Sequence, residues 1–587
     1  VASFFIYSHI SLGQVYPGQM DSTFVPVRSH HYDPELTFDF CVNEPAWNNQ
    51  AGIHSAFGST DRLYFRKEVP VNHNNDLSSS YSTTVWRGER ANAQILVWSS
   101  EALEQVRVST QDLRSAEGNI IPKDRITFEL VRYVLSNYPY AEKKAICGES
   151  PYKSGFLMPD RFETLDRFDL PSQTTRPVWM MVDVPRGTVP GTYKGQVEVR
   201  AKGKAPQLLN LEIVVQNQLL PYPKDWKYRL DLWQNPWAVA WYNHVEPWSP
   251  EHKMLLKQHL KHYADAGGTY ITTYGVHSPW SDNSYMIEGG MIEWIKKADG
   301  TWAFDYKIFD EYVELAMECG IDEAITLYTP IPWGFRHRYK DEATGDYSYI
   351  NWAPSSEEFK KMWNIFLTDF KFHLEAKSWL DITYIGINEN PMEETLAAIN
   401  VVRNHDKCWK ITYAGNWHKE LDGLLDDYSF LYGEEPTIAE QKARAATGRT
   451  STVYVCCNPP IPNSWYVMAY GYDGFLRWAY DAWPEDADRD ARHGSWAAGD
   501  CYMVYPGGKS CIRFEKMREG IVDFEKVRIL RELTAQSGNA QAQGLLKQLD
   551  QHLSIFPKEK EFDENKISAD VRKGNLIIRQ LSDLLAK

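Results

Sequence analysis

The stretch SPEHKMLLKQHLKHYADAGGTYITTY, residues 249–274, contains the structural unit from which much of this chain is built. Ser249 followed by Pro250 is typical of a helix start, because proline fits the first helical position and serine caps the free N–H groups. The glycine pair Gly267-Gly268 follows the helical stretch and predicts the end of that helix. The run from Tyr270 to Tyr274 is aromatic and β-branched, and it predicts a strand.

The same order of helix and strand recurs after residue 226. Further helices are predicted at residues 307–319, 355–376, 391–403 and 437–446. The predicted strands lie at residues 229–233, 270–274, 323–328, 382–387, 409–414, 428–432, 452–457 and 474–479. Eight strands separated by helices or long loops are typical of a (β/α)8 barrel of the TIM type. We therefore predict such a barrel for residues 226–520.

The residues on either side of the barrel have different patterns. Between residues 24 and 220, short runs alternate apolar and polar side chains and are broken by glycine and proline, which predicts an antiparallel β-sandwich. Two prolines, Pro221 and Pro223, indicate a linker between the two domains. Residues 521–587 are charged and helical in pattern, and we expect a helical segment that packs on the outside of the barrel.

The beginning of the chain resembles the end of a signal peptide. Residues 1–14, VASFFIYSHISLGQ, are apolar and then small. We therefore expect residues 1–23 to be an export leader and the protein to be periplasmic or extracellular. No run of about 18 apolar residues follows, so no membrane span is predicted.

Composition narrows the possible partners. The formal net charge is -15 and the pI is about 5.6, which excludes a basic surface for nucleic acid. Aromatic residues make up 14% of the chain, and many stand beside polar residues, as the flat faces that bind sugar rings do. The sequence shows no CxxC pair, no phosphate-binding glycine motif and no metal-ligand spacing, so neither a metal nor a cofactor is expected.

The active site of such a barrel lies at the carboxyl ends of its strands. The residues that follow the predicted strands are mostly aromatic, amide and imidazole side chains: Trp233, Tyr274, His277, Tyr328, Trp333, Asn416, His418, Tyr432, Asn458, Trp478 and Tyr480. Aromatic walls with convergent hydrogen-bonding groups and few carboxylates suit a neutral, polyhydroxylated ligand. We therefore expect a carbohydrate to bind there.

Asn388 and Glu389 follow the fourth predicted strand, in the run DITYIGINENPME at residues 381–393. Desolvation among apolar and aromatic neighbours raises the pKa of a carboxyl group and suits it to protonate a glycosidic oxygen. The alternative is that Glu389 only stabilises the start of the following helix. A conventional glycosidase needs a second carboxylate. The seventh strand ends without one, which leaves Glu434 or Glu435, although Glu-Glu-Pro is also typical of a helix start.

Several motifs, in this order, resemble glycoside hydrolase family 123 over roughly residues 24–540. They are WRGERANAQ at 86–94, GINENPM at 386–392, YAGNWH at 413–418, GYDGFLRWAY at 471–480, GDCYMVYPG at 499–507 and SCIRFEKMREGI at 510–521. The resemblance implies a β-sandwich joined to a (β/α)8 barrel, and retaining hydrolysis of terminal β-linked N-acetylgalactosamine (GalNAc). It also implies an Asp-Glu pair after the fourth strand. The Glu is the acid/base, and the Asp orients the 2-acetamido group, whose carbonyl oxygen attacks the anomeric carbon to form an oxazolinium.

Glu389 matches the acid/base of that family, but Asn388 stands at the position of the Asp. An amide can still accept the acetamide N–H, yet it carries no charge to offset the oxazolinium, a loss that typically lowers the rate by on the order of 10² to 10³. The chain is therefore either an impaired Asp-to-Asn form made to trap substrate or a natural relative with weaker or different chemistry.

The leading hypothesis is a GalNAc-releasing glycosidase in which Glu389 and Asn388 are catalytic. Its sugar pocket is expected to contain Trp233, Tyr413, Asn416, His418, Trp478, Tyr480 and Tyr505. Two alternatives are a conventional retaining glycosidase with two carboxylates and a catalytically silent carbohydrate-binding protein.

Overall fold

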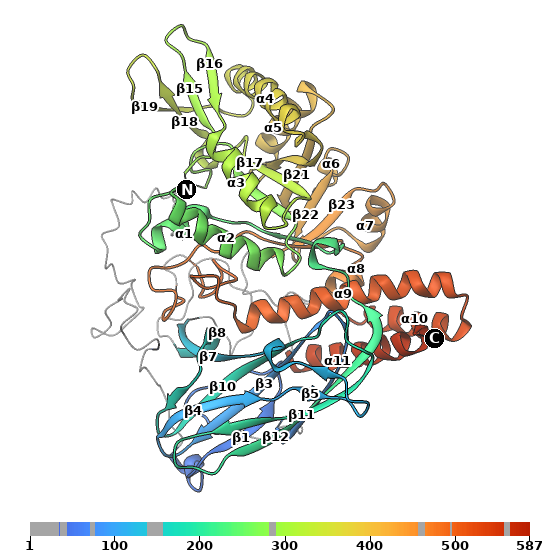
Figure 1. The fold of residues 1–587 in the computed structure, drawn as a ribbon. Coiled ribbons are helices and arrows are strands. Elements are labelled where there is room, and N and C mark those ends of the chain that lie inside the picture. The colour runs from blue at the N-terminus through green and yellow to red at the C-terminus, as the bar shows by residue number, and fades with distance from the viewer. Residues whose placement is uncertain are drawn as a thin grey trace.

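The computed structural model describes residues 35, 44–70, 77–137, 156–280, 289–455, 464–492, 496–556 and 564–586. The expected export leader, residues 1–23, and Asn458 at the end of the seventh predicted strand lie outside these residues. The described chain forms a β-sandwich, a parallel barrel and a group of helices beside both (Figure 1).

The N-terminal domain is the predicted sandwich, made of two sheets. The first sheet has the order β1 (His54–Gly58), β3 (Arg90–Ser99), β10 (Thr174–Asp183), β7 (Ile126–Ser136) and β8 (Phe156–Thr164). The second has the order β2 (Ser80–Arg87), β12 (Gln207–Leu219), β11 (Gly191–Arg200), β4 (Leu103–Thr110) and β9 (Phe168–Leu170), with β5 (Leu113–Arg114) and β6 (Ile120–Ile121) beside it. All pairs are antiparallel except β2 with β12, which is parallel.

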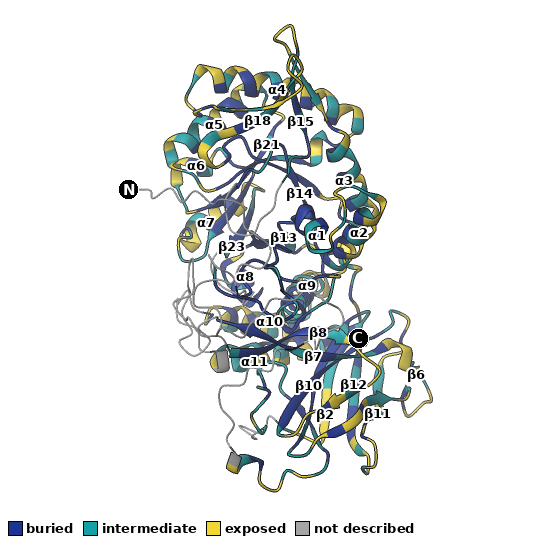
Figure 2. Ribbon diagram, turned by 90° about the vertical axis from the view of Figure 1, so that its left-hand side faces the viewer, coloured by how far each residue is buried: buried dark blue, intermediate teal, exposed yellow. Residues whose placement is uncertain are grey.

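The second domain is the predicted eight-stranded parallel barrel. Its strands are β13 (Arg229–Leu232), β14 (Tyr270–Tyr274), β17 (Ala324–Tyr328), β20 (Thr383–Ile387), β21 (Lys410–Gly415), β22 (Asp427–Leu431), β23 (Thr450–Tyr454) and β24 (Gly474–Arg477). Its helices are α1 (Pro236–Tyr242), α2 (Pro250–Ala264), α3 (Lys307–Glu318), α4 (Glu357–Lys377), α5 (Met392–His405), α6 (Lys419–Asp422), α7 (Ile438–Ala445) and α8 (Ser464–Tyr470). Buried residues concentrate along the strands, whereas the outer helices expose one face (Figure 2).

The helix and strand of residues 249–274 form as the sequence predicts. The Ser249 hydroxyl accepts a hydrogen bond from the backbone N–H of His252 and so caps α2. The chain leaves the helix through Gly267, whose φ of 87° lies in the left-handed region that glycine adopts without strain. The strand that follows, β14, is buried along its whole length.

The barrel is closed by side chains where its first two strands meet. Beyond a single bridge between Leu230 and Gly268, no ladder joins β13 to β14 in the described chain. The Tyr263 hydroxyl instead donates to the carbonyl of Leu230 at 2.7 Å. The side-chain amide of Gln234 accepts from the backbone N–H of Thr272 at 2.9 Å and so ties the two strands together higher up. We call this junction the seam.

Loops after β14 and β17 build a small sheet that the sequence analysis did not predict. Its order is β16 (Trp302–Asp305), β15 (Glu293–Lys296), β18 (Arg336–Asp341) and β19 (Tyr347–Asn351). One face is held on α4 by the indole ring of Trp294, whose centroid lies 5.7 Å from Trp363 and 4.8 Å from Phe366. The sheet projects from the barrel (Figure 1), and these ring contacts hold it on α4.

Three helices follow the barrel: α9 (Ile512–Ser537), α10 (Ala540–Leu553) and α11 (Glu564–Leu585). The expected domain boundary at residue 520 falls inside α9, which runs through it without a break. This helix contacts both domains, since Asn92 of the sandwich donates to Glu519 at 2.9 Å and Trp465 of α8 donates to Asp523 at 2.9 Å. Within the described residues, every helix is too short or too polar to cross a membrane.

Candidate active site

Glu389 lies at the mouth of the barrel, directly after β20. Its side chain is exposed, yet surrounding protein atoms desolvate the carboxyl group and raise its pKa above the usual value of 4.5. Both observations fit a group in an open but concave mouth, where solvent reaches the carboxyl from one side only. No residue of the described chain forms a hydrogen bond or an ion pair with it. The carboxyl group is therefore available to a ligand.

Tyr413 is the side chain whose electrostatics are coupled to Glu389. Burial, and to a smaller extent the nearby Glu389 carboxylate, raise the pKa of its phenol well above the usual range. Tyr413 is 3% exposed and packs edge-on against Tyr428 with ring centroids 5.3 Å apart. The phenol thus stays protonated and stands beside the candidate acid.

Asn388 is buried in the wall between the ends of β17 and β20. Its side-chain amide lies 2.9 Å from the Thr329 hydroxyl, 3.3 Å from the carbonyl oxygen of Ile331 and 3.2 Å from the indole nitrogen of Trp333. With the NH2 group toward Thr329 and Ile331, and the amide oxygen toward Trp333, every contact pairs a donor with an acceptor. A carboxylate here would place an oxygen against the Ile331 carbonyl, so these surroundings match an amide.

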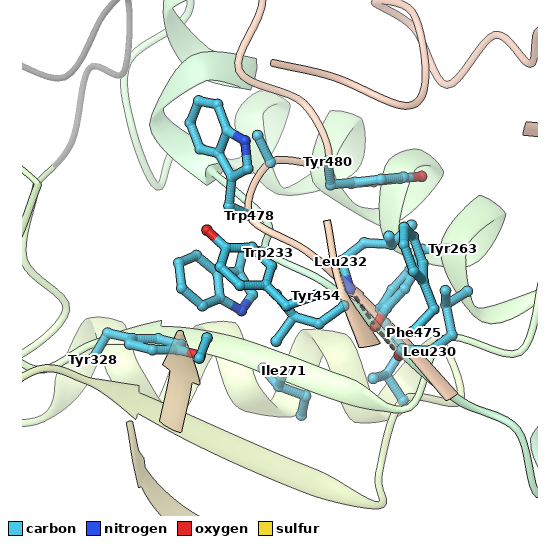
Figure 3. Packing of buried hydrophobic residues seen from close by; sticks show 14 of the residues in the cluster. Leu230, Leu232, Trp233, Tyr263, Ile271, Tyr328, Tyr454, Phe475, Trp478 and Tyr480 are labelled. Carbon is cyan, nitrogen blue, oxygen red and sulfur yellow. Dashed lines mark hydrogen bonds between the residues drawn. The ribbon is translucent and has the colours of Figure 1, made fainter. Parts of the chain in front are cut away.

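Aromatic rings form one wall of the mouth. The indole of Trp233 stacks on Trp280 with centroids 5.1 Å apart, and it lies 4.4 Å from the ring of Tyr328 and 6.4 Å from that of Tyr454. Figure 3 shows Trp233, Tyr328 and Tyr454 together, with Trp478 beside them. All four rings are buried, with at most 6% of each residue exposed, and the exposed parts of Trp233 and Tyr454 are what this cluster presents to a sugar ring.

Comparison with family models identifies the chain. Residues 233–530 match the catalytic domain of glycoside hydrolase family 123, and residues 57–201 match its N-terminal domain. The chain belongs to glycoside hydrolase family 123. The family identifies it as a glycosidase whose substrate is a carbohydrate, and it agrees with the observed sandwich and barrel.

Solved structures show the same fold. A family 123 glycoside hydrolase from Clostridium perfringens, described in connection with glycolipid glycan hydrolysis, has a TM-score of 0.80 at 24% identity and covers 91% of this chain and 99% of its own. A family 39 enzyme from Bacteroides cellulosilyticus WH2 reaches a TM-score of 0.31 at 11% identity, over 71% of this chain and 80% of its own, too low to bear on the fold. A search of curated protein sequences gave no match.

Two expected pocket residues of this family 123 chain, Asn416 and His418, lie on the loop after β21. The Tyr428 hydroxyl donates to the backbone carbonyl of Asn416 at 2.6 Å and accepts from the backbone N–H of His418 at 2.9 Å. The loop is therefore fixed through its backbone, which leaves both side chains without a structural hydrogen bond among the described residues. Trp478 is buried and packs on Trp496 with centroids 5.3 Å apart.

Tyr480 and Tyr505 do not belong to the pocket, which corrects the expected set. Tyr480 is fully buried, and its hydroxyl donates to the backbone carbonyl of His259 at 3.0 Å (Figure 3). The Tyr505 hydroxyl donates to the carboxylate of Asp160 at 2.8 Å, in the contact with the sandwich. The position of a residue after a strand does not show which way its side chain points. Both hydroxyl groups form hydrogen bonds within the protein, to His259 and to Asp160.

Other carboxylates near the strand ends differ from Glu389. The Glu435 carboxylate accepts hydrogen bonds from the backbone N–H of Gly433 at 2.9 Å and from the Tyr466 hydroxyl, so it holds the loop after β22. Glu434 is exposed on the same loop. Asp481 is buried against the backbone N–H of Asn235 at 2.7 Å, and burial raises its pKa to about 8. The described residues contain no cluster of three His, Cys, Asp or Glu that could hold a metal ion.

The sequence analysis missed three residues that shape the mouth. Trp280 and Tyr454 complete the aromatic wall around Trp233, and Thr329 holds the amide of Asn388. Tyr454 is the last residue of β23, three residues before the predicted strand end at residue 457, so it was missed because the predicted boundary lay too far along the chain. Trp280 lies six residues beyond β14, where only the folded loop brings it back to the barrel axis.

Proposed function

We propose that this family 123 glycosidase releases terminal β-linked GalNAc from glycans by a retaining, substrate-assisted mechanism. The observation that carries the proposal is the single carboxyl group of Glu389, which stands at the mouth with a raised pKa and without a protein partner among the described residues. A raised pKa keeps the acid protonated at the pH at which it must donate.

In the first step, Glu389 donates its proton to the glycosidic oxygen while the acetamido carbonyl oxygen of the substrate attacks the anomeric carbon. The bond from the anomeric carbon to the glycosidic oxygen breaks, and the remaining glycan leaves as an alcohol. In the second step, the Glu389 carboxylate takes a proton from water as that water attacks the anomeric carbon and opens the oxazolinium. Two inversions at one carbon give retention, and no protein nucleophile is needed.

Asn388 would orient the acetamido group in this scheme. Both of its N–H bonds are directed to Thr329 and Ile331, and its oxygen accepts from Trp333, which leaves one lone pair of that oxygen for the acetamide N–H. An amide held by three contacts keeps its geometry without a charge. This arrangement supports oriented binding of the acetamido group, without the charge that an Asp at this position would supply.

The second candidate, a conventional glycosidase with two carboxylates, has less support. Its nucleophile would have to be Glu434 or Glu435. Glu435 is committed to Gly433 and Tyr466, which leaves exposed Glu434 as its one candidate among the described residues. A nucleophilic carboxylate must instead face the anomeric carbon, about 5 Å from the acid.

The test compares aryl β-glycosides of GalNAc and of galactose, which differ in the 2-acetamido group. Substrate assistance predicts turnover of the GalNAc compound alone, and loss of that turnover in Glu389→Gln. Equal turnover of both sugars would refute the mechanism. Sugar binding without product release after long incubation would instead identify a carbohydrate-binding protein.

A further inference from the structure

The exposed face of the projecting sheet carries an unusual pair of stacked cations. Arg336 and Arg338 alternate along β18, and Tyr347 and Tyr349 alternate along β19, so that all four side chains lie on one face. The guanidinium of Arg336 lies 3.7 Å from the ring centre of Tyr349, and that of Arg338 lies 4.2 Å from that of Tyr347. We call these four residues the arginine–tyrosine face.

Among the residues that the structure describes, neither guanidinium group has a carboxylate partner. No ion pair or hydrogen bond joins either group to another described residue. The nearest acid on this face, Glu293, accepts a hydrogen bond from the Tyr347 hydroxyl at 3.2 Å instead. In a chain of net charge -15, exposed Arg336 and half-buried Arg338, held only by aromatic rings among the described residues, are a local exception. Stacking fixes the planes of the guanidinium groups and leaves their N–H edges free.

A short segment of chain connects the arginine–tyrosine face to the candidate active site. The short helix η4 (Trp333–Phe335) leads directly into β18, and its Trp333 contacts the amide of Asn388 at 3.2 Å. The backbone N–H of Trp333 also donates to Pro279 at 2.8 Å, in the loop after β14. Burial lowers the pKa of His277, in that same loop, to about 4, and the charges of Arg338 and Arg336 add to the shift. Both cations therefore lie within electrostatic reach of the barrel mouth.

We propose that the arginine–tyrosine face binds a carboxylate-bearing sugar of the substrate glycan, on the leaving-group side of the cleaved bond. This inference rests on the proposed function, because the terminal sugar fills the barrel mouth and the rest of the glycan must leave over its rim. Exposed tyrosine rings, 50% accessible for Tyr347 and 47% for Tyr349, offer platforms for sugar rings. Free guanidinium edges match the two oxygens of a carboxylate.

A carboxylated sugar fits this face better than an anionic membrane does. Membrane attachment by charge needs a broad cluster of basic residues, and the net charge of this chain opposes it. Arg336 and Arg338 lie two residues apart along β18, about 7 Å by strand geometry, and exposed Lys340 follows on the same face, so the row of cations matches the dimension of one or two sugar rings.

The test measures binding by calorimetry with Glu389→Gln protein, so that no substrate is consumed. The ligands are two GalNAc-terminated oligosaccharides that differ only in one carboxylated branch sugar. We expect the acidic ligand to bind about tenfold more tightly, and this preference to disappear in Arg336→Gln/Arg338→Gln. Arg338→Lys should retain only part of it, since a lysine is a point charge without the planar fork. Arg107→Gln/Arg125→Gln, which removes two exposed arginines of the sandwich, should leave it unchanged.

Three results would overturn the proposal. They are equal affinity of the parent protein for both ligands, a stronger preference for a sulfated than for a carboxylated ligand, and loss of binding to anionic phospholipid vesicles in the double variant. A second assay separates the two proposals: hydrolysis of aryl β-GalNAc, a substrate without a second sugar, by protein that retains Glu389. If this protein does not hydrolyse aryl β-GalNAc, the proposed function is refuted, while the preference for the acidic ligand can still be measured. We expect Arg336→Gln/Arg338→Gln to hydrolyse aryl β-GalNAc as the parent protein does.

Discussion

Asn388→Asp tests how position 388 contributes to the reaction. A carboxylate would offset the positive charge that develops on the oxazolinium, and gains of this kind are on the order of 10² to 10³ in kcat. The structure also shows which hydrogen bonds Asn388→Asp removes. Of the three amide contacts, those with Thr329 and Trp333 still pair, since each can donate to a carboxylate, and only the 3.3 Å contact with Ile331 loses its donor.

The carbonyl of Ile331 is not left unpaired by this change, because Asn390 donates to it at 3.2 Å. Folding stability should nevertheless fall by about 2 to 5 kcal/mol, because a carboxylate oxygen then faces the Ile331 carbonyl oxygen and a charge is buried. The assay is kcat for an aryl β-GalNAc substrate, together with urea unfolding. The matched control is Asn390→Asp, which adds the same charge two residues away and should give no gain. A folded Asn388→Asp protein with unchanged kcat would refute the assigned role.

Three further predictions address the acid, the corrected pocket and a buried carboxyl group. Glu389→Gln should lower kcat/KM for aryl β-GalNAc about 10² to 10⁴-fold with little change in Tm. A pH profile of the wild-type protein should show activity that is lost only above the ordinary carboxyl pKa of 4.5, because the pKa of Glu389 is raised. Tyr505→Phe should cost about 1 to 3 kcal/mol of stability, because its hydroxyl donates to buried Asp160, while kcat/KM stays the same; a rise in KM would return Tyr505 to the pocket. Asp481 has a pKa raised to about 8, so the native state keeps a proton that the unfolded state releases, and unfolding free energy should fall as pH rises from about 4 to 8. Asp481→Asn keeps an acceptor for Asn235 and should remove most of that fall, on the order of 4 kcal/mol between pH 5 and pH 8; identical pH dependence in both proteins would contradict the assignment.

The fold could be predicted from sequence because its signals are local. Helix caps such as Ser249, glycine helix ends and buried strand runs repeat in a fixed order, and eight of them define a barrel. The boundary at residue 520 could not be predicted, because α9 is one continuous helix that packs on both domains. The projecting sheet was missed as well. It consists of two hairpins, β15 with β16 and β18 with β19, and only the short β15–β18 ladder joins these two loops.

Sequence position located the candidate acid but not the whole pocket. Glu389 and Asn388 follow a strand end, and every parallel strand of a barrel ends at the same mouth. Tyr480 also follows a strand end, yet its hydroxyl is directed to His259, behind the barrel wall. The direction of a side chain depends on its rotamer and on partners distant in sequence, so aromatic residues near a mouth cannot be sorted into wall and core by pattern alone.

In the described barrel, the seam is the strand junction that has a single bridge in place of a ladder. Elsewhere around the described barrel, neighbouring strands share backbone ladders, whereas β13 and β14 depend on Tyr263 and Gln234. Gln234 is bonded directly to Trp233, so the amide that joins the two strands also sets where the aromatic wall begins. A substitution at Gln234 would therefore reach the strand junction and the stacking surface at once.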